Sequence, residues 1–318
     1  MSTAKVAVCT VTFRRPDGLR RLLDAINGLT FSARPAPEIT LVVVDNDAGR
    51  PMEPLVAAFR RDCRWPVIYG CEPVAGVSSA RNHALRLVPA DSDFIAFIDD
   101  DEVPEPQWLD ELLATAGRFG VDMVQGPVRP VFEREPAGWM TAGRFYEIGP
   151  FEDGAPVRSL GAGNCLIRAA VPRSLGLTFD MRFNHIGGED EDFFGRALRA
   201  GHRAAASSRA VVHETVPASR MRVGWLVRRW FRMGNTLAAI DSLRRPYPAR
   251  ALRVAKGGAR IALGLFQLAA MPVTGTAGAV RGLCNISWGA GSLAGLINLL
   301  HREYDPARAA KRTIPAAR

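Results

Sequence analysis

The first 127 residues alternate between short apolar runs and segments of helical periodicity, and this alternation restricts the possible folds more than any other feature. Strands are expected at residues 6–12, 39–44, 67–69, 94–98 and 121–125, and helices at residues 17–29, 55–61, 78–87 and 108–119. Short apolar runs separated by helices are typical of an α/β fold in which flanking helices cover a doubly wound, mainly parallel sheet. In such sheets ligands bind beyond the carboxyl ends of the strands.

The pattern is weaker in the next part of the chain. Residues 128–157 contain several prolines and glycines and are expected to be irregular. Order returns at residues 160–168 and in a helix that starts near Gly188. Residues 220–243 have the periodicity of an amphipathic helix rich in arginine and aromatic side chains.

Charge divides the chain into two parts. Residues 1–195 carry 20 Lys and Arg against 28 Asp and Glu, whereas residues 196–318 carry 21 against 4. The basic part also holds two uncharged apolar stretches, residues 261–280 and 282–300, with only Arg281 between them. Basic residues beside apolar segments suit an anionic membrane surface, so a membrane partner is expected and nucleic acid is not.

The two apolar stretches are expected to form a helical hairpin that dips into or lies along the cytoplasmic leaflet of the inner membrane. Each has the length of a spanning helix, but small residues dilute it, and one residue is too short a loop to join two spans. Six basic residues would then lie at the lipid headgroups: Arg244, Arg245, Arg250, Arg253, Lys256 and Arg260. The alternative is that the pair packs against the rest of the chain as ordinary core helices.

The cysteines indicate the compartment. There are five, an odd number, and they form no CxxC pair. Residues 1–5 show no basic and apolar leader. A reduced cytosolic compartment with unpaired thiols is therefore expected, with the chain at the cytoplasmic face of the membrane, peripheral or anchored by the hairpin.

Three acids, Asp99, Asp100 and Asp101, follow the apolar run at residues 94–98. Side chains alternate along a strand, so Asp99 and Asp101 should point to the same side. Two ionised carboxylates at close range repel each other unless a cation neutralises them. Oxygen ligands at a strand end suit Mg²⁺ or Mn²⁺ that also holds phosphate oxygens. The alternative is a solvated acidic turn that caps the next helix.

A second acidic cluster occupies residues 187–192. Asp192 precedes Arg196 by four residues, the spacing of a pair on a helix surface. Asp190 instead shares its face with Phe193 and Phe194, which are expected to be buried. An inward carboxylate is costly unless it meets a partner or a ligand, which makes Asp190 the better general-base candidate. The alternative is that all four acids only favour the helix dipole.

Two further features are weaker on their own. His213 follows an apolar run, where a lone histidine is more often a hydrogen-bonded core residue than a ligand. Residues 161–163 form a GxG, but no third glycine and no helical pattern follow. The dinucleotide fingerprint requires both, so this GxG does not predict a dinucleotide site.

Taken in order, the motifs resemble the family 2 glycosyltransferases of the GT-A fold, over roughly residues 4–235. Residues 8–16 resemble the family's opening strand and turn, which lie against the nucleoside, although Cys9 and Arg14 stand where the family more often has proline and asparagine. Residues 76–82, GVSSARN, match its GxSxARN segment, residues 99–101 its DxD motif, and residues 188–190 its GGED motif.

The resemblance implies a role for each matched residue. The donor nucleotide would be bound by Thr10, Thr12, Asp45 at the base, Gly76, Arg81, Asn82, Asp99 near the ribose, and Asp100. Asp101 would bind the metal, Mg²⁺ or Mn²⁺, and His213 falls where many members place a histidine near the metal and diphosphate. Asp190 would be the catalytic base.

The same resemblance implies a metal-dependent, inverting hexosyl transfer from a nucleotide-sugar donor, which is often UDP-glucose in the most similar group. That group builds exopolysaccharide repeat units on a polyprenyl diphosphate carrier. Arg229–Trp230 resembles part of the QxxRW motif of processive synthases, but Leu226 stands at the glutamine position, so transfer of a single sugar is expected.

These expectations divide the chain into a catalytic domain at residues 1–243, basic membrane-associating helices at residues 244–304, and a disordered tail at residues 305–318. The catalytic domain would consist of a nucleotide-binding half, 1–127, and an acceptor-binding half, 128–243. Two other functions remain open. One is a nucleotidyltransferase that acts on a sugar phosphate and releases pyrophosphate. The other is a basic membrane or nucleic-acid adaptor whose catalytic half is inactive.

Overall fold

A computed structural model describes residues 3–32, 35–244 and 247–301, except for the side chains of residues 247–250. Its central sheet has seven strands in the order β3-β2-β1-β4-β8-β6-β9. Their bounds are β1 Lys5–Thr12, β2 Glu38–Asp45, β3 Val67–Cys71, β4 Phe94–Phe97, β6 Met123–Gln125, β8 Cys165–Arg168 and β9 Ala204–Ala206. Only β8 runs antiparallel to its neighbours, so the mainly parallel sheet is confirmed.

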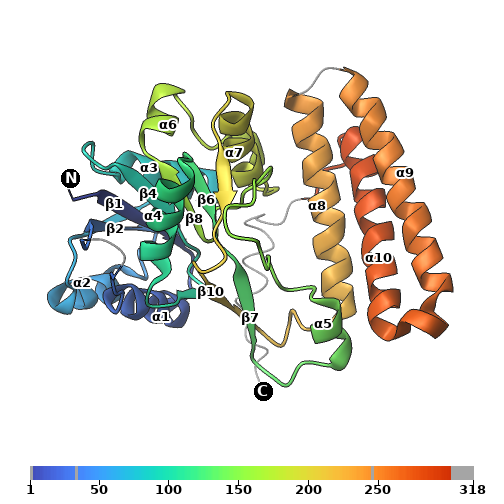
Figure 1. The fold of residues 1–318 in the computed structure, drawn as a ribbon, viewed down its shortest axis with the longest axis horizontal. Helices are drawn as coiled ribbons and strands as arrows, with labels where there is room; N and C mark the ends of the chain where they lie inside the picture. Colours follow the sequence, from blue (N-terminus) through green and yellow to red (C-terminus); the bar gives the residue numbers. More distant parts are fainter. Residues whose placement is uncertain (1–2, 33–34, 245–246, 302–318) are drawn as a thin grey trace.

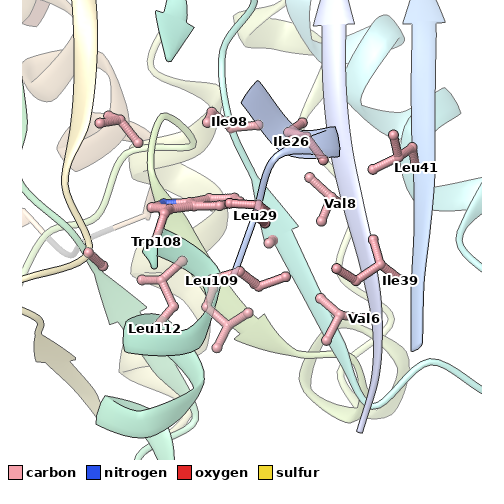
Figure 2. Close-up of a cluster of buried hydrophobic side chains, with 14 of the residues drawn as sticks. Val6, Val8, Ile26, Leu29, Ile39, Leu41, Ile98, Trp108, Leu109 and Leu112 are labelled. Carbon is pink, nitrogen blue, oxygen red and sulfur yellow. The ribbon is translucent and has the colours of Figure 1, made fainter. Parts of the chain in front are cut away.

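Helices cover both faces of this sheet (Figure 1). They are α1 Pro16–Asn27, α2 Glu53–Asp62, α3 Val77–Leu87, α4 Trp108–Phe119, α6 Ala170–Ser174 and α7 Glu189–Arg199, with a 3₁₀ turn at Met181–Phe183. Alternate residues of β1 enter two separate cores. Val6 and Val8 pack on the side of α1, α2 and α4, and Ala7 and Cys9 on the side of α3 and α7. Figure 2 shows the first core, where the Trp108 indole lies beside Leu29 and above Leu109. This two-sided burial is the doubly wound arrangement that the apolar runs predict.

A smaller sheet in the order β5-β10-β7 lies beside the carboxyl ends of the large one. It contains β5 Glu102–Pro104, β10 Val212–Val216 and β7 Val128–Phe132, and α5 Gly138–Gly143 follows β7. The prediction that residues 128–157 are irregular is therefore wrong for β7 and α5. Pro130 weakened the strand pattern, but β7 is an edge strand of its sheet, where a missing N–H donor is tolerated.

The remaining helices form a three-helix bundle: α8 Val223–Arg244, α9 Tyr247–Ala269 and α10 Met271–Leu296. In Figure 1, α10 lies between α8 and α9, and α9 is on the side away from the sheet. The turn between the last two helices is at Ala270, so the prediction that Arg281 separates them is wrong. Arg281 lies inside α10, where its Nη2 donates to the Gly143 carbonyl and its guanidinium lies 5.2 Å from the Phe145 ring centroid.

The basic residues expected at headgroups are largely engaged within the protein. Arg244 pairs with Asp180 and Asp192, Arg253 pairs with Asp241, and Arg260 donates to Asn285 over 2.7 Å. Only Lys256 of the six is described as exposed. Arg245, the Arg250 side chain and the expected disordered tail lie outside the described residues. In the part of the chain that the structure covers, no helix combines the length and apolar character needed to cross a membrane.

Candidate active site

Arg81, in the GxSxARN segment, contacts both acidic motifs at the carboxyl end of the large sheet. Its Nη2 donates to Asp99 Oδ1 over 3.1 Å, and its Nη1 donates to Glu189 Oε1 and lies 4.0 Å from Asp190 Oδ2. The side chain is buried on α3, and its guanidinium lies 5.9 Å from the Phe179 ring centroid. One guanidinium therefore brings the GxSxARN, DxD and GGED segments together, although they are far apart in the sequence.

Asp190 lies in the first turn of α7, which begins after Gly188. Its Oδ2 accepts from the Ala162 N–H over 3.1 Å and its Oδ1 from the Glu191 N–H over 2.8 Å. Its side chain keeps 27% of its surface exposed. The carboxylate is thus oriented by two backbone amides while it remains open to a ligand, as a general base requires.

The neighbouring acids differ from Asp190 in burial. The predicted pair of Asp192 and Arg196 is confirmed at 2.9 Å, and Phe193 and Phe194 are buried as expected. Asp192 and Glu189, however, are the deeply buried carboxylates of this turn. The expected order of burial is therefore reversed, because Asp192 meets Arg196 of its own helix and Arg244 of α8, and Glu189 meets Arg81.

Burial controls the protonation of the crowded carboxyls. It raises the pKa of Glu189 to about 7, although Arg81 opposes this rise, and Asp190 adds to it. Burial also raises the pKa of Asp99, against the attraction of Arg81, with further rises caused by Asp101 and Asp190. The pKa of Glu102 is raised by burial and then by Asp99. Mutual repulsion of acids is thus present, as predicted, but desolvation is the larger cause.

The three consecutive acids occupy a turn, because β4 ends at Phe97. Asp100 accepts from Thr12 Oγ1 over 2.8 Å and from Arg15 Nη1 over 2.7 Å, and burial raises its pKa to about 6. Asp101 Oδ2 lies 3.0 Å from Arg15 Nη1 and 3.5 Å from Arg220 Nη1. Asp99 and Asp101 therefore meet different arginines, although they remain close enough for Asp101 to raise the pKa of Asp99.

The other residues expected to bind the nucleotide are arranged around β1, β2 and α3. The fully buried Asp45 accepts from the Met52 N–H over 3.0 Å and from Tyr69 Oη over 3.0 Å. Thr10 is buried, and its hydroxyl has no hydrogen-bond partner among the described residues.

Gly76 and Asn82 have structural contacts in this region. Gly76 has a φ of 133°, and its N–H donates to Asn46 Oδ1 over 2.8 Å. A Cβ at this position would collide with the Asn184 side chain. Asn82 exchanges two hydrogen bonds with the Phe179 backbone, at 2.8 and 2.7 Å, so it holds the segment that precedes the 3₁₀ turn.

His213 is not brought to the three acids. It pairs with Val103 across β10 and β5, and its Nε2 lies 3.1 Å from Glu105 Oε1. The next residue, Glu214, accepts from Arg220 Nη1 over 3.1 Å, and burial raises its pKa, with Asp101 and Asp99 contributing. Alternation along β10 explains the difference, because successive side chains face opposite sides.

Sequence reasoning therefore missed Arg15, Glu102, Glu214 and Arg220 as members of this cluster. The strand alternation of residues 212–216 could have indicated Glu214 once His213 was placed. Arg15 and Arg220 carry no such signal, because each reaches Asp101 only through the tertiary fold.

The chemistry of the donors suits a divalent cation of the Mg²⁺ class. Among the residues that the structure describes, no group of three His, Cys, Asp or Glu side chains is arranged to hold a metal ion. Mg²⁺, however, is commonly bound by only one or two carboxylates together with substrate phosphates. Burial disfavours the charged form of Asp99, and a cation would restore it. The carboxylate oxygens of Asp99 and Asp101 therefore fit a metal site whose remaining ligands would be the oxygens of a bound diphosphate.

A cavity of about 550 Å³ is lined in part by Asn82. Its lining includes Phe179, Asp180, Arg196 and Arg244, but not Asp190 or the three consecutive acids. The convergence of the motifs, rather than this cavity, locates the candidate active site.

Comparison with known proteins gives matches in sequence and in structure. The family model described as glycosyl transferase family 2 matches residues 7–175. Succinoglycan biosynthesis protein ExoM of Rhizobium meliloti is 35% identical over 231 residues, which cover 73% of this chain and 72% of that protein. ExoW of the same organism is 31% identical over 120 residues, 37% of this chain and 36% of that protein.

Two solved structures share the fold. The mannosyltransferase PcManGT from Pyrobaculum calidifontis, in complex with GDP-Man and Mn²⁺, superposes with a TM-score of 0.64 at 17% identity, covering 93% of this chain and 88% of that one. S. aureus TarS 1–349 in complex with UDP superposes with a TM-score of 0.52 at 16% identity, covering 91% and 90%. The GT-A architecture predicted from the motifs is thus confirmed.

Proposed function

This chain belongs to glycosyl transferase family 2, and we propose that it moves a hexose from a UDP-sugar to a hydroxyl of a polyprenyl-diphosphate-linked glycan with inversion at the anomeric carbon. The chain is a glycosyltransferase. The observation that carries the proposal is the position of Arg81, within hydrogen-bond distance of Asp99 and Glu189 and 4.0 Å from Asp190. It brings the donor-binding acids and the base candidate into one site.

Asp190 is the proposed base. The acceptor oxygen forms a bond to the anomeric carbon while the bond from that carbon to the diphosphate breaks, and its electron pair stays on the diphosphate. Asp190 receives the proton of the attacking hydroxyl. Attack opposite the leaving group inverts the configuration, so an α-linked donor yields a β-linked product. The two amides that bond Asp190 keep it in position for this transfer.

The leaving diphosphate needs positive charge. Asp101 would hold Mg²⁺ or Mn²⁺, which when bound neutralises charge that develops on the diphosphate. Arg15 and Arg220, which face Asp101, would hold its carboxylate in place and add to the local positive field. The Mn²⁺ complex of the mannosyltransferase with the same fold supports a divalent ion here.

The proposed class of acceptor is inferred from the matched proteins. Two matched proteins are named for succinoglycan biosynthesis, which supports exopolysaccharide assembly as the setting. Leu226, at the glutamine position of the processive motif, is fully buried in a cluster with Val216 and Cys284. A buried leucine cannot supply the polar side chain of that glutamine, which supports transfer of one sugar per acceptor. With a lipid-linked acceptor, the enzyme would act at the cytoplasmic face of a membrane.

The two other functions considered from the sequence are less well supported. Family membership and the glycosyltransferase relatives argue against a nucleotidyltransferase. The assembled acids and Arg81 argue against an inactive adaptor, because an adaptor has no need for a buried guanidinium with carboxylates from two distant motifs around it.

The test is a donor screen with the full chain. UDP- and GDP-hexoses are incubated with Mg²⁺ or Mn²⁺ and a synthetic polyprenyl-diphosphate-linked sugar, and nucleoside diphosphate, pyrophosphate and glycan product are measured. We expect UDP release, no pyrophosphate, and a β-linkage by NMR. Pyrophosphate release, or a retained α-linkage, would overturn the proposal, as would equal turnover by the Asp190→Asn variant.

A further inference from the structure

In the bundle of α8, α9 and α10, the helix α9 carries most of its large apolar side chains on its exposed side. We define the outer apolar face of α9 by Leu252, Val254, Leu263, Leu265, Phe266, Met271 and Val273, the last two at the turn into α10. Phe266 is 69% exposed, Leu265 57% and Val273 91%. Large exposed apolar patches usually mark a surface that binds a partner or a membrane.

Small residues fill the contact between α9 and α10 instead. A Cβ on Gly264 would lie 2.5 Å from the Gly282 carbonyl oxygen, and one on Gly289 would lie 2.5 Å from that of Gly257. The two backbones therefore approach each other through paired glycines. In water, helices normally associate by burying their large apolar side chains, whereas close contact through small residues is typical of helices that pack in lipid.

Polar groups are also on the inside. Asn285 accepts from Arg260 over 2.7 Å and donates to Gln267 Oε1 over 2.8 Å. Asn235, which is 1% exposed, donates to the Gly291 and Leu299 carbonyls. These inner polar groups, which lie among buried apolar residues such as Val280 and Trp288, are therefore satisfied by hydrogen bonds. The outer helix α9 nevertheless presents hydrocarbon to the surroundings, which is unusual for a protein in water.

The charge around this face favours an anionic lipid surface over a second copy of the chain as its binding partner. Lys256 is the one exposed charged side chain described within residues 251–276. The sequence contains no Asp or Glu from residue 242 to residue 302. Two copies of this face would bring positive charge against positive charge without an acid to pair with it, whereas an anionic lipid surface would attract it.

We propose that the outer apolar face of α9 lies on the headgroup and upper acyl region of an anionic lipid bilayer, with α9 parallel to the membrane plane. In Figure 1, α9 is the helix farthest from the sheet, so this contact leaves the face of α8 that packs on the α7 segment undisturbed. The inference deepens the proposed function, on which it rests for the acceptor, because it holds the enzyme where a lipid-linked acceptor is present.

The experiment measures binding of the full chain to vesicles of phosphatidylcholine, alone or with about a third of phosphatidylglycerol, by co-sedimentation at physiological salt. The test variant is Leu265→Gln/Phe266→Ser, and the control is Leu175→Gln, an exposed leucine that directly follows α6, outside the bundle. Circular dichroism checks that each variant melts like the wild type, which is expected because the changed side chains are exposed.

We expect the double variant to bind vesicles about tenfold more weakly or worse, and the control to bind like the wild type. Lys256→Gln should weaken binding to the anionic vesicles by about fivefold and leave neutral vesicles unaffected. The inference is overturned if the wild type binds neither vesicle, or if the double variant binds as well as the wild type. A lipid-free dimer that the double variant dissociates would also overturn it, in favour of a second copy.

A separate measurement distinguishes failure of the surface from failure of the proposed function. Release of UDP from a soluble UDP-sugar should be equal in the wild type and the double variant. Vesicle binding without turnover of any nucleotide sugar would support the membrane-binding surface and contradict the proposed function. Turnover without vesicle binding would support the proposed reaction and contradict the membrane-binding surface.

Discussion

Arg244, the last residue of α8, donates from Nε to Oδ1 of Asp192 over 2.8 Å. Asp192 is fully buried, and it follows the base candidate Asp190 by two residues in the first turn of α7. The same guanidinium pairs with Asp180, whose carbonyl accepts from Ser78 on α3. One side chain of the bundle thus fixes the helix that carries the base and the segment that contacts the nucleotide-binding helix.

Removing Arg244 should loosen this connection. Arg244→Gln leaves Asp192 with Arg196 as its arginine partner, and we expect a loss of about 3 kcal/mol in the free energy of unfolding, because a buried carboxylate loses one of its two compensating charges. kcat should fall while the KM for the donor stays nearly constant. Urea denaturation and steady-state kinetics measure the two effects.

Arg182→Gln is the matched control for this prediction. Arg182 also pairs with Asp180, but its side chain is 58% exposed, so we expect a change below about 0.5 kcal/mol. Arg244→Lys should restore part of the stability and of kcat. Equal behaviour of the Arg244 and Arg182 variants would contradict the positioning role.

The base prediction concerns Asp190→Asn. This variant keeps the shape and loses the proton acceptor, so kcat should fall by about 10²–10⁴ while UDP affinity changes little. Glu191→Gln is the control, because this neighbouring carboxylate bonds Ser159 at 2.7 and 2.8 Å away from Arg81. Calorimetry with UDP and single-turnover kinetics separate binding from chemistry. Normal turnover by Asp190→Asn would move the role to another acid, with Glu189 the first to examine.

The metal prediction compares Asp101 and His213. EDTA should abolish turnover and weaken UDP binding, and Mg²⁺ or Mn²⁺ should restore both, because phosphate oxygens complete the proposed ligand set. Asp101→Asn should weaken metal-supported UDP binding by about tenfold or more. His213→Asn should weaken it less, since His213 would have to leave Glu105 to reach the ion. Metal-independent binding of UDP by the wild type would contradict this prediction.

The pH prediction concerns Glu189, whose pKa burial raises to about 7 from a usual 4.5. A carboxyl whose folded pKa lies above its unfolded value favours folding in its protonated form. Its contribution is complete below the unfolded pKa and is lost as pH rises through 7. Relative to Glu189→Gln, the wild type should therefore lose about 1–3 kcal/mol of unfolding free energy between pH 4.5 and 8. Urea titrations at several pH values test this, with the exposed Glu53→Gln as control.

Local periodicity predicted much of the fold, because burial on one face leaves a trace in neighbouring residues. The apolar run before Asp45 and the run before Asp99 marked β2 and β4, which are adjacent to β1 in the sheet. The same signal failed where an element depends on distant partners. β7 exists through its pairing with β10, and Pro130 hides it from a local reading.

The sequence by itself determined the order of the motifs, the helical turn that carries Asp190, and the family. Only the tertiary structure decided which acid of that turn is buried and which partners each acid meets. It brought Arg81 to Glu189 across 108 positions and Arg244 to Asp192 across 52. It also placed the α9–α10 turn at Ala270, although the sequence suggested Arg281. The physical reason is that periodicity records the face of an element that avoids water, whereas a charged group's partner depends on which elements the whole fold brings together.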